Sequence, residues 1–153
     1  MSQIESKLAE LGLELPVQPK SGGNYLPHRI NGNTLILAGV VCVIDGVVTH
    51  EGQVGDEQTI ESGYEAAKVC ALNALAAIKG ALGELDRVDE FIYMGGYVNA
   101  VANFGSSPQV INGASDLFVA LFGEAGKHAR AAVAVAGLPM KATVEIQVTV
   151  TFK

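Results

Sequence analysis

One arginine, Arg130, stands alone in the segment ARAAVAVAGLP (129–139), whose other residues are all small or apolar. This segment predicts a strand over 130–136 with the arginine at its start. A guanidinium is a planar set of N–H donors and binds anions well. Two interpretations are open. Arg130 either ends a strand and reaches solvent, or it faces a cleft and binds an anion there.

A second candidate, Glu145, lies in the last segment, 143–152, where apolar and polar residues alternate strictly. Such alternation predicts a strand with one apolar face, and Glu145 belongs to the polar face. If the turn GLPMKA (137–142) joined antiparallel neighbours, Arg130 and Glu145 would share one face, roughly 13 Å apart along the strand. A small ligand could bridge that distance. The alternative is that Glu145 lies on a solvated strand face.

The elements that must position these residues follow from the hydrophobic periodicity of the chain. We expect helices at 3–12, 59–83 and 106–123, and strands at 34–44, 89–100, 130–136 and 143–152. Asp56 and Ser107 are the expected N-caps of the two long helices. The segment 34–44 is apolar on both parities, which predicts a strand covered on both faces. The segment 16–33 holds three prolines and predicts an irregular connector.

The order of these elements predicts the fold class. Two long helices can cover only one face of one sheet, so we expect a single α+β domain of two layers with a mixed sheet. The other face of the sheet then needs a cover. The chain is rich in apolar residues, with 49% hydrophobic and 17% charged residues. We therefore expect copies of the chain to meet there in a closed homo-oligomer.

Composition and charge argue against several classes of protein. A net charge of −6 without a lysine or arginine cluster disfavours nucleic-acid binding. No run of about 18 apolar residues predicts a membrane span, and the first residues lack the pattern of a signal peptide, so a cytoplasmic location is expected. No metal-ligand or phosphate-loop motif occurs. Cys42 and Cys70 are expected to be buried, reduced thiols.

Several segments, taken in order, resemble the YjgF/RidA family, also called the L-PSP endoribonuclease-like family. They are Tyr25, the apolar strand after it, the long helix, the helix with Asn112, ARAAVAVAGLP and VEIQVTVTF. The resemblance covers residues 24–153 and leaves the N-terminal helix as an addition. It implies a chorismate-mutase-like fold that assembles as a homotrimer, with the helices outside and the active sites in clefts between subunits.

The resemblance also implies an activity. Family members of the RidA type hydrolyse reactive enamines and imines to a 2-keto acid and ammonia, and they need no cofactor or metal. A 2-imino or 2-keto acid is therefore the implied ligand. Arg130 matches the essential arginine of the family, which would hold the substrate carboxylate. Glu145 matches its acidic residue, which would orient or deprotonate the attacking water.

Four further positions match residues that bind substrate in the family. Tyr25 matches the tyrosine that closes the cleft, and Asn112 matches a helix asparagine near the pocket. The backbone at Ala38 and Gly39 would approach the ligand, because glycine permits close contact. From the sequence alone, Tyr25 could equally be an ordinary loop aromatic, and Asn112 a polar group on the helix surface.

Other positions depart from the family pattern. Ala132 stands in place of a cysteine, Ala134 in place of an acidic residue, and Ala38 and Val40 in place of a serine and a glutamine. Each change makes the pocket less polar, and a larger or more apolar acid would fit these changes better. The alternative function is therefore a non-catalytic trimer that binds small carboxylates or a protein partner.

The endoribonuclease role that gives the family its other name is a third possibility. The acidic net charge and the lack of a basic groove argue against it. Histidines could serve in RNA cleavage, but His28, His50 and His128 lie in separate loops without a signature spacing. We expect them to be exposed. His128 is the one to follow, because it lies two residues before Arg130.

Overall fold

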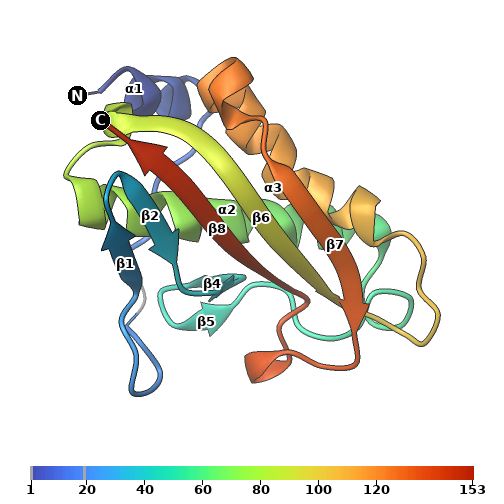
Figure 1. Cartoon of the computed structure of the whole chain (residues 1–153). Helices are drawn as coiled ribbons and strands as arrows, with labels where there is room; N and C mark the ends of the chain where they lie inside the picture. The colour runs from blue at the N-terminus through green and yellow to red at the C-terminus, as the bar shows by residue number, and fades with distance from the viewer. Residues whose placement is uncertain (1, 19) are drawn as a thin grey trace.

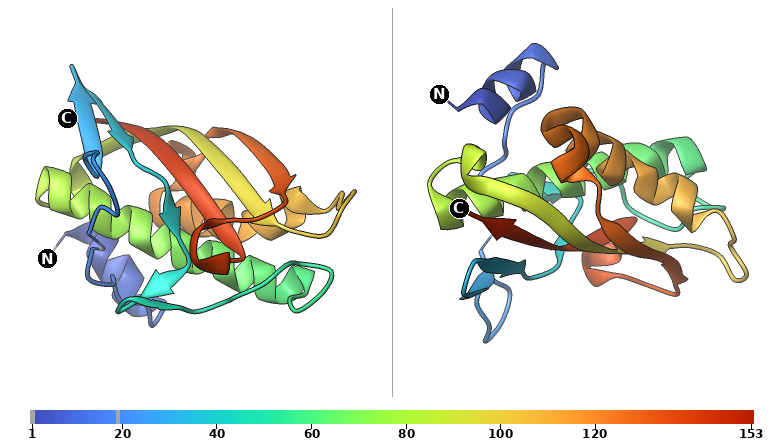
Figure 2. Two further views of the ribbon diagram at one scale, coloured as in Figure 1. Left: turned by 90° about the horizontal axis from the view of Figure 1, so that it is seen from below. Right: turned by 45° about the horizontal axis from the view of Figure 1, so that its top comes forward.

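The computed structural model describes residues 2–18 and 20–153, which form two layers. The helices are α1 (Gln3–Glu10), α2 (Ile60–Leu82) and α3 (Ser107–Phe122), with 3-10 turns η1 (Leu85–Arg87), η2 (Gly123–Gly126) and η3 (Pro139–Lys141). The strands are β1 (His28–Asn31), β2 (Thr34–Leu37), β3 (Val40–Val41), β4 (Val43–Ile44), β5 (Val47–Val48), β6 (Val88–Asn99), β7 (Ala129–Val135) and β8 (Val144–Phe152). Both long helices lie on one side of a mixed sheet (Figure 1 and Figure 2), which confirms the expected α+β class.

The main sheet is ordered β1-β2-β8-β6-β7, and β3 also pairs with β8. Strand β8 shows the expected alternation, because its valines and Ile146 are buried while the residues between them are partly exposed. The buried side chains face α2 and α3, and the core fills the space between the two layers. Strand β1 lies in the segment that was expected to be an irregular connector, so this strand was missed.

Strand β7 lies at an edge of the sheet, beside β6 and not beside β8. It pairs with β6 in parallel, and β6 pairs with β8 in antiparallel fashion. The expectation that 137–142 joins antiparallel neighbours is therefore wrong. The reason is the crossover through α3, because a strand, a helix and the next strand form a parallel pair. The chain must then pass β6 to reach β8, through η3, where Met140 and Lys141 have φ values of 60° and 57°.

The apolar segment 34–44 is not one strand. Strands β2 and β3 both pair with β8, but Ala38 and Gly39 between them have no ladder partner, and β4 forms a separate hairpin with β5. Within one chain the second face has no cover, because Ile36 is 44% exposed on the face away from the helices. Beside the break, the side-chain amide of Gln147 donates to the last carbonyl of β2 at 3.1 Å.

The starts of the two long helices differ from expectation by a few residues. The N-cap of α2 is Thr59, which forms a capping box with Ser62, so Asp56 is not the cap. The N-cap of α3 is Ser106, which makes no capping hydrogen bond with its side chain, and Ser107 is the first helical residue. Local sequence placed the helices correctly, and only the choice among neighbouring cap candidates was wrong.

Close contacts at two glycines set the position of α3 beside α2 and above the sheet. A Cβ at Gly113 would overlap the carbonyl oxygen of Tyr64 on α2, so only glycine lets the two helices approach this closely. The Tyr64 hydroxyl also donates to the Asp116 carboxylate at 2.7 Å, and this bond raises the pKa of Tyr64 to about 12. On the sheet side, Ile111 of α3 lies against Gly96 of β6. The position of α3 is therefore fixed from both sides.

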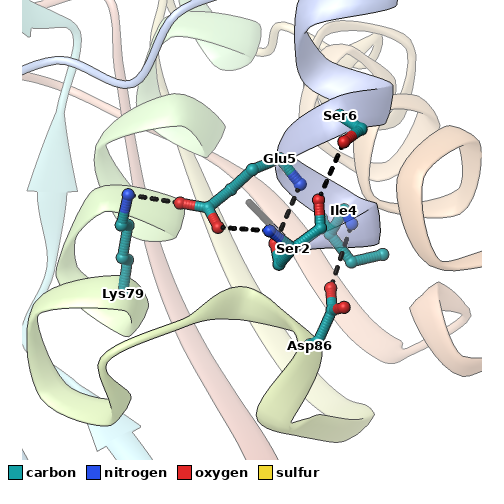
Figure 3. A network of polar contacts seen from close by, with 6 residues as sticks. All are labelled: Ser2, Ile4, Glu5, Ser6, Lys79 and Asp86. Atoms are coloured by element: carbon teal, nitrogen blue, oxygen red, sulfur yellow. Dashed lines mark hydrogen bonds and ion pairs between the residues drawn. The ribbon is translucent and has the colours of Figure 1, made fainter.

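The expected N-terminal helix is present as α1, and polar contacts dock it on the rest of the fold (Figure 3). The Asp86 carboxylate of η1 accepts hydrogen bonds from the backbone N–H groups of Gln3 and Ile4, at 2.8 and 3.0 Å. It thereby satisfies donors that have no partner inside the helix. Glu5 forms an ion pair with Lys79 of α2, which lowers the pKa of Glu5.

Cys42 and Cys70 are buried and free, as expected. The Cys42 thiol donates to the carbonyl of His50, and the Cys70 thiol donates to the carbonyl of Val144. Burial raises the pKa of the Cys70 thiol. Cys70 is therefore a protonated core residue.

The sheet face away from α2 and α3 exposes large apolar side chains. Ile36, Tyr93 and Val133 are each more than a third exposed, and the strand register places Ile36 and Tyr93 on either side of Thr149. An exposed apolar surface of this kind is typical of an interface between chains. Within residues 2–18 and 20–153, no helix is long and apolar enough to cross a membrane.

Candidate functional site

Arg130 lies near the start of β7, and its side chain points toward the helix layer. It is in register with Met94, whose side chain is fully buried beneath the helices. The Nη1 atom donates to the Ser115 hydroxyl at 2.9 Å, and Nη2 donates to the Pro108 carbonyl at 3.2 Å. Both partners belong to α3. The guanidinium is therefore held against a helix and does not simply reach into solvent.

The Arg130 cation has unused hydrogen-bond donors. A guanidinium has five N–H groups, and these contacts use two of the five. In the described part of the chain, the ion pairs are Glu5–Lys79 and Glu124–Lys127, so no carboxylate there pairs with Arg130. A partly buried cation with free donors and no paired carboxylate can bind an anion.

Asn112 lies on the face of α3 that this guanidinium contacts. Pro108, Asn112 and Ser115 are spaced i, i+4 and i+7 along α3, and residues with this spacing share one face of a helix. Because the first and last of them contact Arg130, Asn112 lies on the stripe between those two contacts. The structure therefore brings together two of the residues that the sequence singled out, Arg130 and Asn112. Ser115 and Pro108 were not predicted, although the helical spacing from Asn112 could have found them.

His128 is not an exposed loop side chain, so that expectation is wrong. Its Nε2 atom lies 2.9 Å from the Ser115 hydroxyl, and its Nδ1 atom lies 2.8 Å from the Gly126 carbonyl. Its ring meets the Phe118 ring edge to face, with centroids 6.1 Å apart. Burial, and to a lesser degree the charge of Arg130, lowers the pKa of His128. The surroundings of the ring therefore favour its neutral form.

Glu145 lies on β8 and faces away from the helices, in register with Tyr97 of β6 and Val41 of β3. It is half-buried, and burial raises the pKa of its carboxyl group. No ion pair within the described residues involves it. A Cβ at Gly39 would lie 2.5 Å from its Oε2 atom. The break between β2 and β3 therefore makes room for a carboxylate that approaches the backbone closely.

Arg130 and Glu145 lie on opposite faces of the sheet. Their partners on β6 are Met94 and Tyr97, which are three residues apart and so point to opposite sides. The expectation that both residues share one face is wrong, because β6 lies between β7 and β8. A single chain does not bring these two residues together.

Tyr25 lies near the opposite edge of the sheet, in the loop before β1. Its side chain is 54% exposed, and its hydroxyl accepts a hydrogen bond from the backbone N–H of Gly22 at 3.2 Å. With Asn24, Leu26 and other residues of this loop it lines an open hollow of about 490 Å³. Because β1 and β7 are the two edges of the sheet, Tyr25 is remote from Arg130 in the same chain.

Residues 2–18 and 20–153 contain no group of three or more histidine, cysteine or acidic side chains that could hold a metal ion. Where β7 meets α3, the Arg130 guanidinium offers free N–H donors that could hold an anion. The open face of the sheet supplies a carboxylate with a raised pKa.

Comparisons with known proteins agree with this architecture. The family model described as "YjgF/chorismate mutase-like, putative endoribonuclease" matches residues 5–150. Protein TCP17 of Trypanosoma cruzi is 37% identical over 149 residues, which make up 97% of this chain and 93% of that protein.

Two solved structures are similar over nearly the whole chain. Atu1372 of Agrobacterium tumefaciens, a protein of unknown function, shares 41% identity with a TM-score of 0.92, covering 99% of this chain and 94% of its own. A "putative endoribonuclease" of Shewanella oneidensis MR-1 shares 33% identity with a TM-score of 0.95, covering 99% of this chain and 100% of its own. The similarity extends over so much of the chain that it includes α1.

Proposed function

The chain belongs to the YjgF/chorismate mutase-like family, and from this premise we propose that it is a hydrolytic deaminase of reactive 2-imino and enamine acids. The products would be a 2-keto acid and ammonia. The observation that carries the proposal is the state of Arg130, a cation fixed against α3 with free N–H donors and no carboxylate partner among the described residues.

The proposed reaction begins with the carboxylate of the substrate bound to the free donors of Arg130, with the Asn112 amide beside it. Glu145 accepts a proton from a water molecule, whose oxygen forms a bond to C2 of the imine. Glu145 returns that proton to the imine nitrogen, which gives a carbinolamine. The carbinolamine hydroxyl then transfers its proton to the nitrogen as the C2–N bond breaks, so that ammonia leaves and the C2 carbonyl forms. The raised pKa of Glu145 suits it to this role, because a base is most effective when its pKa is near the working pH.

We propose that this site forms between subunits of a homotrimer. In one chain, Arg130 faces the helix side at the β7 edge, Glu145 faces the open side, and Tyr25 lies near the β1 edge. A small acid cannot reach all three within one subunit. Packing of the exposed apolar sheet face against a neighbouring chain would supply Glu145 and Tyr25 from one subunit and Arg130 from another. A cytoplasmic location remains part of the proposal.

The test supplies imine from an amino-acid oxidase or a threonine dehydratase and follows its decay in the presence of the protein. We expect the wild type to accelerate hydrolysis and Arg130→Ala to lose about 100-fold of that rate, the effect of removing one partner of a charged hydrogen-bonded pair. Arg130→Lys keeps the charge and tests the need for a planar donor set. Light scattering should give a trimer, and a monomer would contradict the site between subunits.

A non-catalytic trimer that binds small carboxylates or a protein partner is the second candidate. It is favoured by Ala132, Ala134 and Val40, which stand where the family has more polar pocket residues. Such a protein would bind 2-keto acids through Arg130 without accelerating imine hydrolysis, and Glu145→Gln would leave the affinity intact. Calorimetry with 2-ketobutyrate, run beside the kinetic assay, separates the two. Ribonuclease activity is disfavoured by the net charge of −6.

A further inference from the structure

We propose that Ser115 and His128 are positioning residues that hold the Arg130 guanidinium in the orientation that binds a carboxylate. This inference rests on the proposed role of Arg130. It concerns two residues that the family pattern did not point to, one on α3 and one at the entry to β7. They act through Arg130 and do not contact the substrate.

A continuous set of hydrogen bonds joins the three side chains. The Arg130 Nη1 atom lies 2.9 Å from the Ser115 Oγ atom, which in turn lies 2.9 Å from the His128 Nε2 atom. The His128 Nδ1 atom lies 2.8 Å from the carbonyl oxygen of Gly126 in η2. The set therefore begins at the cation and ends on the backbone of a turn.

The direction of every bond in this set follows from the chemistry of its ends. A carbonyl oxygen can only accept, so the Nδ1 atom of His128 carries the proton that is donated to Gly126. In the neutral ring, Nε2 then has a lone pair and accepts the hydroxyl hydrogen of Ser115. The lone pairs of Ser115 are left to face Arg130, which can only donate. The tautomer of His128 thus fixes the serine hydroxyl as an acceptor for the guanidinium.

The surroundings of His128 favour the neutral ring that this arrangement needs. The ring is partly buried against Phe118, and burial lowers its pKa. Of the charged groups nearby, Glu124 of η2 pairs with Lys127 just after it, the Asp116 carboxylate of α3 accepts a hydrogen bond from Tyr64, and Arg130 makes no ion pair within the described residues. A protonated His128 would place two cationic donors on one hydroxyl, which like-charge repulsion disfavours.

The arrangement matters for binding because an arginine side chain is long and flexible. A free arginine loses about 2 kcal/mol of rotamer entropy when a ligand immobilises it. Here Ser115 and the Pro108 carbonyl hold Nη1 and Nη2 before any ligand arrives, which reduces that loss on binding. Pro108 contributes only backbone, so Ser115 and His128 are the part of this support that substitution can remove.

The experiment compares Ser115→Ala, Ser115→Thr and His128→Phe with the wild type, in calorimetric titrations with 2-ketobutyrate and in imine hydrolysis. Ser115→Ala and His128→Phe should raise the dissociation constant and the KM about tenfold, the loss of one hydrogen bond to a charged group, with a smaller effect on kcat. Ser115→Thr keeps the hydroxyl and should restore most of the affinity. Tyr64→Phe is the matched control, because it also removes one hydroxyl bonded to α3 but lies away from Arg130.

The outcomes are distinguishable. A wild type that neither binds 2-ketobutyrate nor hydrolyses imines overturns the proposed function, and the positioning role falls with it. A wild type that binds, together with a Ser115→Ala variant of unchanged affinity, overturns the positioning role alone. Thermal melts complete the comparison. Ser115→Ala and Tyr64→Phe are compared in melting temperature and in affinity for 2-ketobutyrate. If both variants melt at a lower temperature and both lose affinity to the same extent, the role of Ser115 is structural and the positioning role is wrong.

Discussion

Arg130 and Glu145 are held on opposite faces of one sheet, with strand β6 between the strands that carry them. If both serve one reaction, each site must combine the arginine of one subunit with the glutamate of another. Two inactive variants should then complement each other. Equal amounts of Arg130→Ala and Glu145→Gln chains, unfolded and refolded together, would assemble about one quarter of their sites from two intact contributors.

The expected result is partial recovery of imine hydrolysis in the mixture, with only the small residual rate of each variant when it is refolded alone. Size-exclusion chromatography of differently tagged chains checks that mixed oligomers have formed. If mixed oligomers form and activity stays absent, the two residues do not act in a shared site.

Gly39 should be required for activity because of its closeness to Glu145. A Cβ added to Gly39 would lie 2.5 Å from the carboxylate, so Gly39→Ala must displace the Glu145 side chain. A misplacement of about 1 Å can cost about 100-fold in rate, and we expect a loss of 10- to 100-fold in kcat/KM. Gly105→Ala is the control, because nothing lies within 4 Å of its added Cβ. Equal kinetics for the two variants would show that Glu145 needs no such space.

Glu145 should also reduce the stability of the folded chain at neutral pH. Burial raises its pKa in the folded state, so the folded chain binds this proton more tightly than the unfolded chain. Stability therefore falls as pH rises from the ordinary carboxyl pKa through the raised value. Glu145→Gln, which has no charge, should melt at a higher temperature than the wild type at pH 7.5 and lose that advantage near pH 4. Exposed Glu10→Gln serves as the control, and an advantage independent of pH would contradict the argument.

Asp86 should govern the docking of α1. It accepts hydrogen bonds from the first backbone N–H groups of that helix, and the loss of a capping acceptor costs about 1 kcal/mol. In Asp86→Ala, amide hydrogens of residues 3–10 should exchange several-fold faster while those of α2 stay protected. Hydrogen-exchange mass spectrometry measures both segments, with exposed Asp89→Ala as the control. If the amide hydrogens of α1 exchange at the same rate in Asp86→Ala as in the wild type, α1 is held in place by Leu8 and the Glu5–Lys79 ion pair instead.

Local pattern was sufficient for the long elements, but it missed β1, joined β2, β3 and β4 into one strand, and did not give the order of strands in the sheet. Helices α2 and α3 and strand β8 follow from periodicity, because one face of each is buried. The partner of β7 does not, since an apolar strand of small residues can pair on either side. The placement of Arg130 on α3 likewise depends on β6 entering between β7 and β8. Ser115 and His128 lie 13 residues apart and meet only because α3 packs over the start of β7.

The contact at Gly113 makes the arginine site sensitive to a change made behind it. Gly113 touches α2, while Asn112 and Ser115 turn another side of the same helix toward Arg130. A single methyl group at position 113 would push α3 away from α2 and shift Ser115 and the Pro108 carbonyl, the two direct contacts of the guanidinium, together. Loss of function at such a position would look like damage to the core, yet its cause would be a guanidinium that no longer meets its supports. A substitution at a glycine on the buried side of a helix can thus change the affinity of a binding site even when the residues of that site stay the same.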